Sequence, residues 1–125
     1  GVQTCALPIS AYLDAATLLA SPRSTGTNTP LKIYQYLRSG RPIVATRLRT
    51  HTQVLSEDTA FLAEPTPAGF AAAILAALRD PAAARAVGDR ARQLADTKYS
   101  DEAYIAKTHA AITQLGPEAR QEVVA

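Results

Sequence analysis

The sequence predicts an α/β protein built on a parallel sheet with flanking helices. Short apolar runs alternate with helix-like segments from residue 11 to about residue 115, which is the pattern of parallel strands joined by helices. The strand-like runs are apolar throughout, as expected of strands that are buried on both faces. The chain has 125 residues, 47% of them hydrophobic, enough for one domain with a core of its own.

The first predicted elements precede a helix whose start carries two signals. Residues 12–15 read as the end of a helix and residues 17–20 as a short buried strand. After a polar loop, Thr29 is expected to cap a helix that begins at Pro30, because proline suits the first helical position. The inward stripe of this helix is expected to contain Pro30, Ile33, Tyr34 and Leu37.

Two further strands follow. Gly40 and Pro42 should end the helix, residues 43–46 should form the second strand, and residues 60–63 the third. Between these strands we expect a short turn of helix around residues 52–55.

Three cap signals open the remaining helices. Thr66-Pro67, Asp80-Pro81 and Ser100 each place a side-chain acceptor before a helical pattern. The expected inward stripes are Phe70, Ile74, Leu75 and Leu78 in the first helix and Ala84, Val87, Ala91 and Leu94 in the second. An exposed charged face is expected on Arg85, Asp89, Arg92 and Asp96. The last helix should run to about residue 115, followed by a frayed polar tail at residues 116–125.

Composition argues against several classes of protein. The formal net charge is +2 with the two signs mostly interleaved, so no general attraction to nucleic acid is expected. A single cysteine, Cys5, excludes a disulfide framework and a cysteine-rich metal site. No apolar run approaches the roughly 20 residues of a membrane span. We therefore expect a cytoplasmic protein, with peripheral association with the inner face of the membrane left open.

The N-terminal residues are set apart from the fold. Residues 2–9, VQTCALPI, resemble the translation of one frame of a common short-read sequencing adapter. We expect residues 1–9 to be such an artefact and exclude them from the fold; the alternative is an ordinary irregular N-terminus.

A basic, glycine-containing loop marks a candidate anion site. Between Asp14 and Glu57 there is no acidic residue, and the basic residues of that run are Arg23, Lys32, Arg38, Arg41, Arg47 and Arg49. Ligands of open α/β sheets bind beyond the carboxyl ends of strands, where this loop lies, and helix starts attract phosphate. Lys32 in a first turn opposes the helix dipole unless an anion compensates. The alternatives are a plain polar turn and a solvated lysine.

The order of several segments resembles a family 4-type glycosyltransferase of the GT-B fold, in the group 1 glycosyl transferases. The segments are the loop itself, PLKIYQYL at residues 30–37, GRPIVAT at residues 40–46 and THTQVL at residues 50–55. The resemblance implies that residues 10–115 are a partial, Rossmann-like, nucleotide-sugar-binding domain with a C-terminal helix, the C-terminal part of a donor domain. An acceptor domain N-terminal to it would complete the active cleft, and in this family the last helix commonly crosses back onto that domain.

Donor-binding residues follow from the resemblance. Many members carry a Glu, seven residues and a second Glu in this loop and helix, and Thr27 and Gln35 occupy those positions here. The expected donor-binding residues are Gly26, Thr27, Asn28, Thr29, Leu31, Lys32 and Gln35, with His51 and Arg23 as further candidates. A lone loop histidine such as His51 is otherwise expected to be exposed, and Gln53 matches a position that usually carries Glu. No metal site, cofactor or catalytic triad is expected.

Three functions compete at this point. The first is a glycosyltransferase fragment, inactive alone, that moves a sugar from a nucleotide-diphosphate donor to an unknown acceptor, whether glycan, lipid or small molecule. The loss of both motif carboxylates supports an alternative, a catalytically silent GT-B-like module that binds a phosphorylated ligand. Nucleic-acid binding is the weakest, because aromatic residues do not interleave with the basic run.

Overall fold

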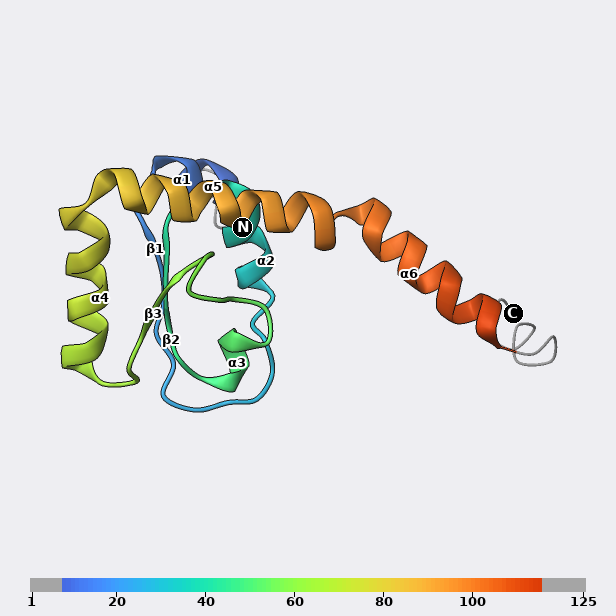
Figure 1. Ribbon diagram of the computed structural model, residues 1–125, viewed down its shortest axis with the longest axis horizontal. Coiled ribbons are helices and arrows are strands. Elements are labelled where there is room, and N and C mark those ends of the chain that lie inside the picture. Colours follow the sequence, from blue (N-terminus) through green and yellow to red (C-terminus); the bar gives the residue numbers. More distant parts are fainter. Residues whose placement is uncertain (1–7, 116–125) are drawn as a thin grey trace, which may run out of the picture.

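The computed structural model describes residues 8–115 and confirms an α/β fold (Figure 1). Three parallel strands form one sheet in the order β1-β2-β3. The expected frayed tail at 116–125, and all but the end of the expected artefact at 1–9, lie outside the described residues.

The strands are β1 (Leu19–Ser21), β2 (Ile43–Thr46) and β3 (Phe61–Ala63). The prediction for β2 is confirmed residue for residue, and β3 begins one residue later than expected. The predicted first strand, 17–20, was placed too early. Its neighbour β2 begins only after Pro42, whose carbonyl accepts from the Leu19 N–H at 2.8 Å, so pairing starts at Leu19.

The described part of the chain contains six helices. They are α1 (Ile9–Ala15), α2 (Lys32–Ser39), α3 (Arg49–Thr52), α4 (Pro67–Arg79), α5 (Pro81–Lys98) and α6 (Asp101–Gln114). Figure 1 shows α2 and α3 on one side of the sheet and α4 on the other, with α5 crossing the end where β1 begins. Helix α6 projects away from this body and has no buried residue.

The core lies between α2, β2 and α5. Ile33 and Leu37 of α2 and Ile43 of β2 are fully buried and pack with Ala91 and Ala95 of α5. At the amino end of the sheet the backbones of α5 and of the turn after α2 touch directly. A Cβ atom added at Gly88 would lie 2.2 Å from the carbonyl oxygen of Gly40, so only glycine fits there.

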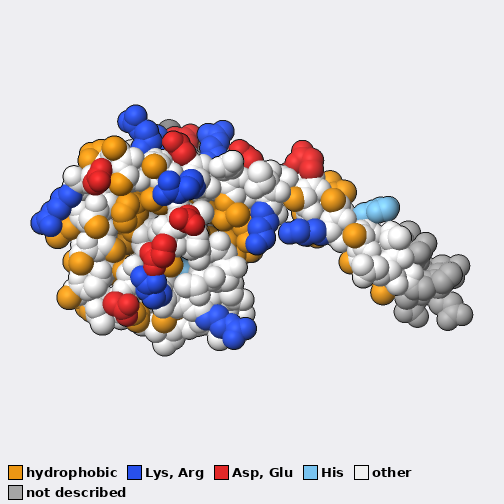
Figure 2. All heavy atoms as spheres, viewed as in Figure 1, with side chains coloured by type: hydrophobic (Ala, Val, Ile, Leu, Met, Phe, Trp, Pro, Cys, Tyr) orange, Lys and Arg blue, Asp and Glu red, His pale blue; other side chains and the backbone are white. Residues whose placement is uncertain are grey.

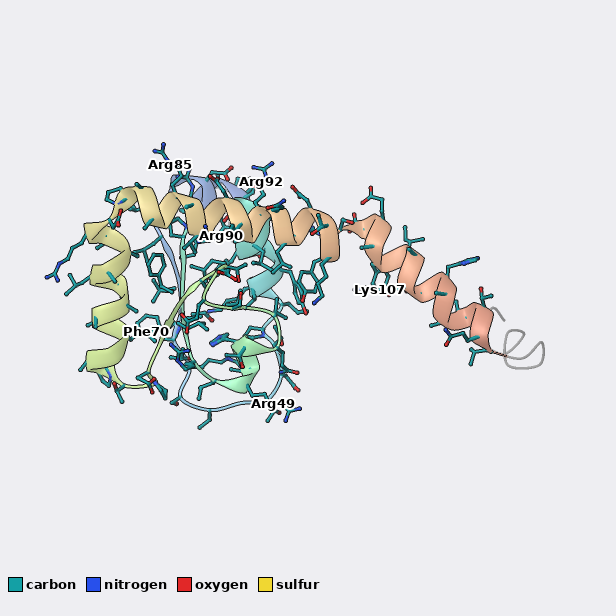
Figure 3. All side chains as sticks on the ribbon, viewed as in Figure 1. Arg49, Phe70, Arg85, Arg90, Arg92 and Lys107 are labelled. Atoms are coloured by element: carbon teal, nitrogen blue, oxygen red, sulfur yellow. The ribbon has the colours of Figure 1, made fainter. Side chains whose placement is uncertain are left out.

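The expected stripes hold for α5 and only in part for α4. Ala84, Val87 and Ala91 are buried as predicted, while Leu94 is half-buried. Figure 3 shows Arg85 and Arg92 projecting outward from α5, as expected of its charged face.

In α4, Leu75 and Leu78 were predicted to face inward but are 45% and 47% exposed, whereas Ala77 is buried. The half-buried Phe70 and Ile74 continue to Ala77 at the next turn of the inward row, which leaves the two leucines on the adjoining row. Hydrophobic side chains accordingly reach the surface over α4 in Figure 2.

The three cap predictions are confirmed. Side-chain oxygens of Thr66, Asp80 and Ser100 accept the backbone N–H groups of Gly69, Ala83 and Ala103 at 3.0–3.1 Å. Each cap satisfies one of the N–H groups that a helix start leaves without a partner.

Two predicted helix starts were wrong. Helix α2 begins at Lys32 rather than Pro30, and Thr29 makes no capping bond. The carbonyls of Pro30 and Leu31 accept from Ile33 and Tyr34, three residues on, so a tighter turn precedes the helix.

Helix α3 lies at residues 49–52 rather than around residues 52–55. The Leu48 carbonyl accepts N–H groups of both His51 and Thr52, and these bonds close the turn earlier in the chain than expected. The end of α2 at Gly40 is confirmed, with a left-handed φ of 69°.

Candidate functional site

A single loop, residues 22–31, covers the carboxyl ends of β1 and β2. In Figure 1 this loop forms the lower edge of the molecule, and α3 stands above it. Ser21 closes β1 and Thr46 closes β2, and both polar side chains are buried. Because both strands are parallel, these side chains meet at the same end of the sheet.

His51 of α3 joins the two strand ends from below the surface. Its side chain is 0% exposed. One ring nitrogen, Nε2, lies 2.9 Å from Ser21 Oγ, and the other, Nδ1, lies 2.9 Å from the Thr46 carbonyl and 3.1 Å from Thr46 Oγ1. The alternative of an exposed loop histidine is therefore wrong.

The contacts of His51 define its protonation. The Thr46 carbonyl can only accept, so Nδ1 carries a hydrogen and donates it. Burial lowers the pKa of the imidazole, the bond to the Thr46 backbone opposes this, and Arg23 and Lys32 lower it further. The ring is thus neutral near pH 7, and Nε2 accepts the Ser21 hydroxyl hydrogen.

Side chains of α3 and of Gln53, the residue that ends α3, hold the loop by hydrogen bonds to its backbone carbonyls. Thr50 Oγ1 donates to the Asn28 carbonyl, and Gln53 Nε2 donates to the Thr27 carbonyl at 2.7 Å. The guanidinium of Arg23 spans the loop, 3.4 Å from Thr50 Oγ1 and 3.5 Å from the Asn28 carbonyl. The loop is therefore shaped by bonds that leave the side chains of Thr27 and Asn28 exposed.

Gly26 of this loop has a backbone conformation that favours glycine. Its φ is +120°, and an added Cβ atom would lie 2.9 Å from Nη1 of Arg23. A side chain at this position would be strained and would displace the arginine that holds the loop.

The remaining predicted donor-binding residues line the start of α2. Leu31 is 83% exposed, and the exposed Lys32 places its ammonium group 5.7 Å from the ring centre of Tyr36. Gln35 lies one turn further along α2, also exposed, where it borders a hollow with Leu13 and Asp14 of α1. The residues that line this hollow belong to α1 and α2, and none of them is in the loop at 22–31.

The basic run divides into paired and unpaired members. Arg38 lies 3.4 Å from Asp101, and Arg47 pairs with Glu57 and Glu64. Arg41 donates to the Asp14 carbonyl of α1. Within residues 8–115, Arg23, Lys32 and Arg49 have no acidic partner, and Figure 3 shows Arg49 at the edge occupied by the loop.

On the α4 side, the same end of the sheet carries a groove of about 490 Å³. Arg23 and Thr46 line it together with Thr66, which caps α4, and Phe70 and Ile74 of α4. Its wall is mainly apolar, so polar groups are concentrated on the loop side of the strand ends.

The described residues offer neither a metal cluster nor a membrane-spanning helix. Residues 8–115 contain no cluster of three or more His, Cys, Asp or Glu side chains that could hold a metal ion. No helix in that range is long and apolar enough to cross a membrane.

Sequence reasoning overlooked the buried polar network of Ser21, Thr46 and Thr50. The available signal was that each of the first two polar residues ends an otherwise apolar strand. Their partner His51 lies five residues after Thr46, a spacing that only the observed position of α3 turns into contact.

Solved structures similar to this chain share its fold. HepE of Anabaena, in complex with UDP-glucose, matches with a TM-score of 0.74 and 16% identity over 83% of this chain and 29% of its own. Sucrose-phosphate synthase of Thermosynechococcus elongatus matches with a TM-score of 0.72 and 27% identity over 82% and 26%. The chain therefore spans less than a third of the length of these proteins.

The family follows from the sequence match. No curated protein matches the chain. The family model of the glycosyl transferases group 1 matches residues 3–80, which contain all three strands, the loop at 22–31 and α3. The chain belongs to the group 1 glycosyl transferases.

Proposed function

We propose that this chain is the C-terminal part of the donor-binding domain of a glycosyltransferase, one that transfers a sugar from a nucleoside diphosphate to an acceptor. The observation that carries the proposal is the fixed loop at 22–31, followed at once by Lys32, at the carboxyl ends of β1 and β2. UDP-glucose and UDP are bound in the HepE structures to which the chain is similar.

In this proposal the donor diphosphate lies against the loop and the start of α2. Leu31 and Lys32 are exposed there, and Arg23 and Lys32 have no acidic partner in the described chain. Cations held near a helix start stabilise the charge that develops on a departing diphosphate. No protein nucleophile is required for this contribution.

The altered motif shifts the binding energy toward the phosphates. Thr27 and Gln35 stand where many members have carboxylates, and neither forms charge-assisted hydrogen bonds to sugar hydroxyls. In this proposal the exposed Gln35 amide contacts the ribose and Thr27 contacts the transferred sugar. Affinity should therefore depend strongly on Lys32.

An upstream acceptor domain would complete the enzyme. The chain covers 29% of HepE and 26% of the sucrose-phosphate synthase, and the projecting helix α6 has no buried residue to hold it against the described body. We propose that α6 packs on that domain, that the isolated chain is inactive, and that the enzyme works in the cytoplasm. The acceptor is a glycan, lipid or small molecule.

Binding of UDP to the complete polypeptide tests the proposal. Calorimetric titration should show a single UDP site, and Lys32→Ala should weaken it about tenfold, the equivalent of about 1.4 kcal/mol. Lys98→Ala is the matched control, because Lys98 is also exposed and lies 5.6 Å from the ring centre of a tyrosine, Tyr99. The control should bind UDP like the unmodified protein.

Equal affinities in all three proteins would contradict the placement of the diphosphate. If UDP binds as expected but UDP-sugars are neither hydrolysed nor transferred in the presence of acceptors, the catalytically silent module becomes the better account, consistent with Thr27 and Gln35 in place of carboxylates.

A further inference from the structure

We propose that His51 is a positioning residue that sets the conformation of the loop at 22–31 without touching the ligand. The inference rests on the proposed function for its ligand, and on the contacts of His51 for its geometry. Both ring nitrogens are engaged by Ser21 and Thr46, and the side chain is fully buried. His51 therefore has no free polar atom to offer a donor phosphate.

The first connection runs through the end of β2. Thr46 Oγ1 lies 3.1 Å from His51 Nδ1 and accepts the Arg23 backbone N–H at 3.2 Å. Arg23 stands at the beginning of the loop. The Nδ1 hydrogen is shared between the Thr46 carbonyl and Thr46 Oγ1, so the ring holds the oxygen that accepts the first backbone hydrogen bond of the loop.

The second connection runs through α3. Helix α3 has four residues, too few to hold its place by backbone bonds alone. The buried ring of His51 fixes this short helix against two strand ends, and its neighbours Thr50 and Gln53 then hold the carbonyls of Asn28 and Thr27. Loss of the ring should therefore release the loop at Arg23 and at Thr27 and Asn28 together.

The proposed role of His51 requires the neutral form of its ring. Nδ1 must donate to the Thr46 carbonyl while Nε2 accepts from Ser21, and only a neutral imidazole does both. An asparagine at this position supplies an N–H close to the place of Nδ1 but no acceptor at Nε2. A leucine supplies neither, so the two substitutions grade the expected defect.

Amide hydrogen exchange of the ligand-free complete polypeptide gives the first readout. In His51→Leu, exchange of the Arg23 amide, which donates to Thr46 Oγ1, should accelerate about tenfold relative to the rest of the sheet, and UDP should bind about tenfold more weakly, the equivalent of about 1.4 kcal/mol. His51→Asn should recover part of both losses.

Thr59→Ala is the matched control. Thr59 is also buried, and its hydroxyl bonds the Ser56 backbone in the turn before β3, away from the loop. At matched global stability this variant should leave loop exchange and UDP affinity unchanged. If Thr59→Ala loosens the loop as much as His51→Leu, or if His51→Leu leaves it unchanged, the inference is overturned.

A surface variant keeps the test decisive if His51→Leu fails to fold. Gln53 is exposed, so Gln53→Ala removes the bond to the Thr27 carbonyl without disturbing the core. The backbone order parameters of residues 27–29, measured by NMR relaxation without ligand, should fall, and unchanged values there would refute the second connection. Failure of the unmodified protein to bind UDP would reject the proposed function alone, because the exchange measurement needs no ligand.

Discussion

At the amino ends of the strands, α5 approaches the turn after α2 so closely that Gly88 meets the Gly40 carbonyl without room for a side chain. At the carboxyl ends the loop at 22–31 is instead held by side chains, through Thr50, Gln53 and the buried His51. A close contact between backbones leaves no room for a larger residue, whereas each hydrogen-bonding side chain that holds the loop can be substituted singly. We therefore expect the amino end of the sheet to set stability and the carboxyl end to adapt to the proposed ligand.

The largest expected effect lies at the packed end. Gly88→Ala would bring a Cβ atom to 2.2 Å from the Gly40 carbonyl, and the forced separation of α5 from the turn should cost about 3 kcal/mol of unfolding free energy. Urea denaturation measures this loss. Asp89→Ala, on the exposed face of the same helix, should stay within about 0.5 kcal/mol of the unmodified protein.

UDP affinity tests whether the two ends of the sheet are independent of each other. Measured on the folded fraction, it should be unchanged in Gly88→Ala, since the atoms that a Cβ at Gly88 would meet belong to Gly40 and Arg41 and not to the loop at 22–31. A variant that folded normally yet lost UDP binding would show that the two ends are coupled rather than separate.

The second effect concerns pH. Burial lowers the pKa of His51 in the folded state from its ordinary value of 6.5, so below about pH 6.5 the unfolded chain binds a proton that the folded chain does not. The contribution of His51 to stability is present above that pH. It is lost as the pH falls, with a slope of at most about 1.4 kcal/mol per pH unit.

Denaturation curves between pH 8 and pH 5, compared with His51→Asn, isolate this term. The difference in stability between the two proteins should shrink toward acid pH. A constant difference would mean that His51 does not change its proton affinity on folding.

The smallest effect is expected from a surface ion pair. Arg47 pairs with Glu57 and Glu64, and all three side chains are about half exposed or more. Arg47→Ala should therefore lower the unfolding free energy by less than about 1 kcal/mol. Raising the salt concentration should reduce the difference further, which denaturation at 0.05 M and 1 M salt would reveal; a larger, salt-insensitive loss would contradict it.

Much of the fold was predictable because local signals and tertiary structure agree. β2 matches its apolar run, and the caps at Thr66, Asp80 and Ser100 are read directly from side-chain chemistry. Where the signal was ambiguous, the prediction failed. Pro30 suits a helix start, yet tighter hydrogen bonds to Pro30 and Leu31 delay α2 to Lys32.

The candidate site was only partly predictable. The loop and its position at the strand ends follow from the order of elements, and the need for Gly26 follows from residue type. The role of His51 does not follow from the sequence. It depends on the burial of the His51 ring between Ser21, which lies 30 positions earlier in the chain, and Thr46, which lies five positions earlier. Contacts of that kind are set by how α3 packs, and the expected position of α3 was three residues too late.

The surroundings of Gln35 are likewise set by how the helices pack and not by sequence spacing. Spacing along the sequence places Gln35 in a motif with Thr27, but helix geometry turns it toward α1. Its proposed contact with the ribose therefore concerns a different part of the donor from the diphosphate at Lys32.

A crystal structure of the complete polypeptide with UDP tests the central claim most directly. We predict that the diphosphate lies at the carboxyl ends of β1 and β2, within hydrogen-bonding distance of Lys32 Nζ or of backbone N–H groups of residues 26–32, with His51 buried behind it. A diphosphate bound in the groove beside Phe70 and Ile74, or at the packed end near Gly88, would contradict the account.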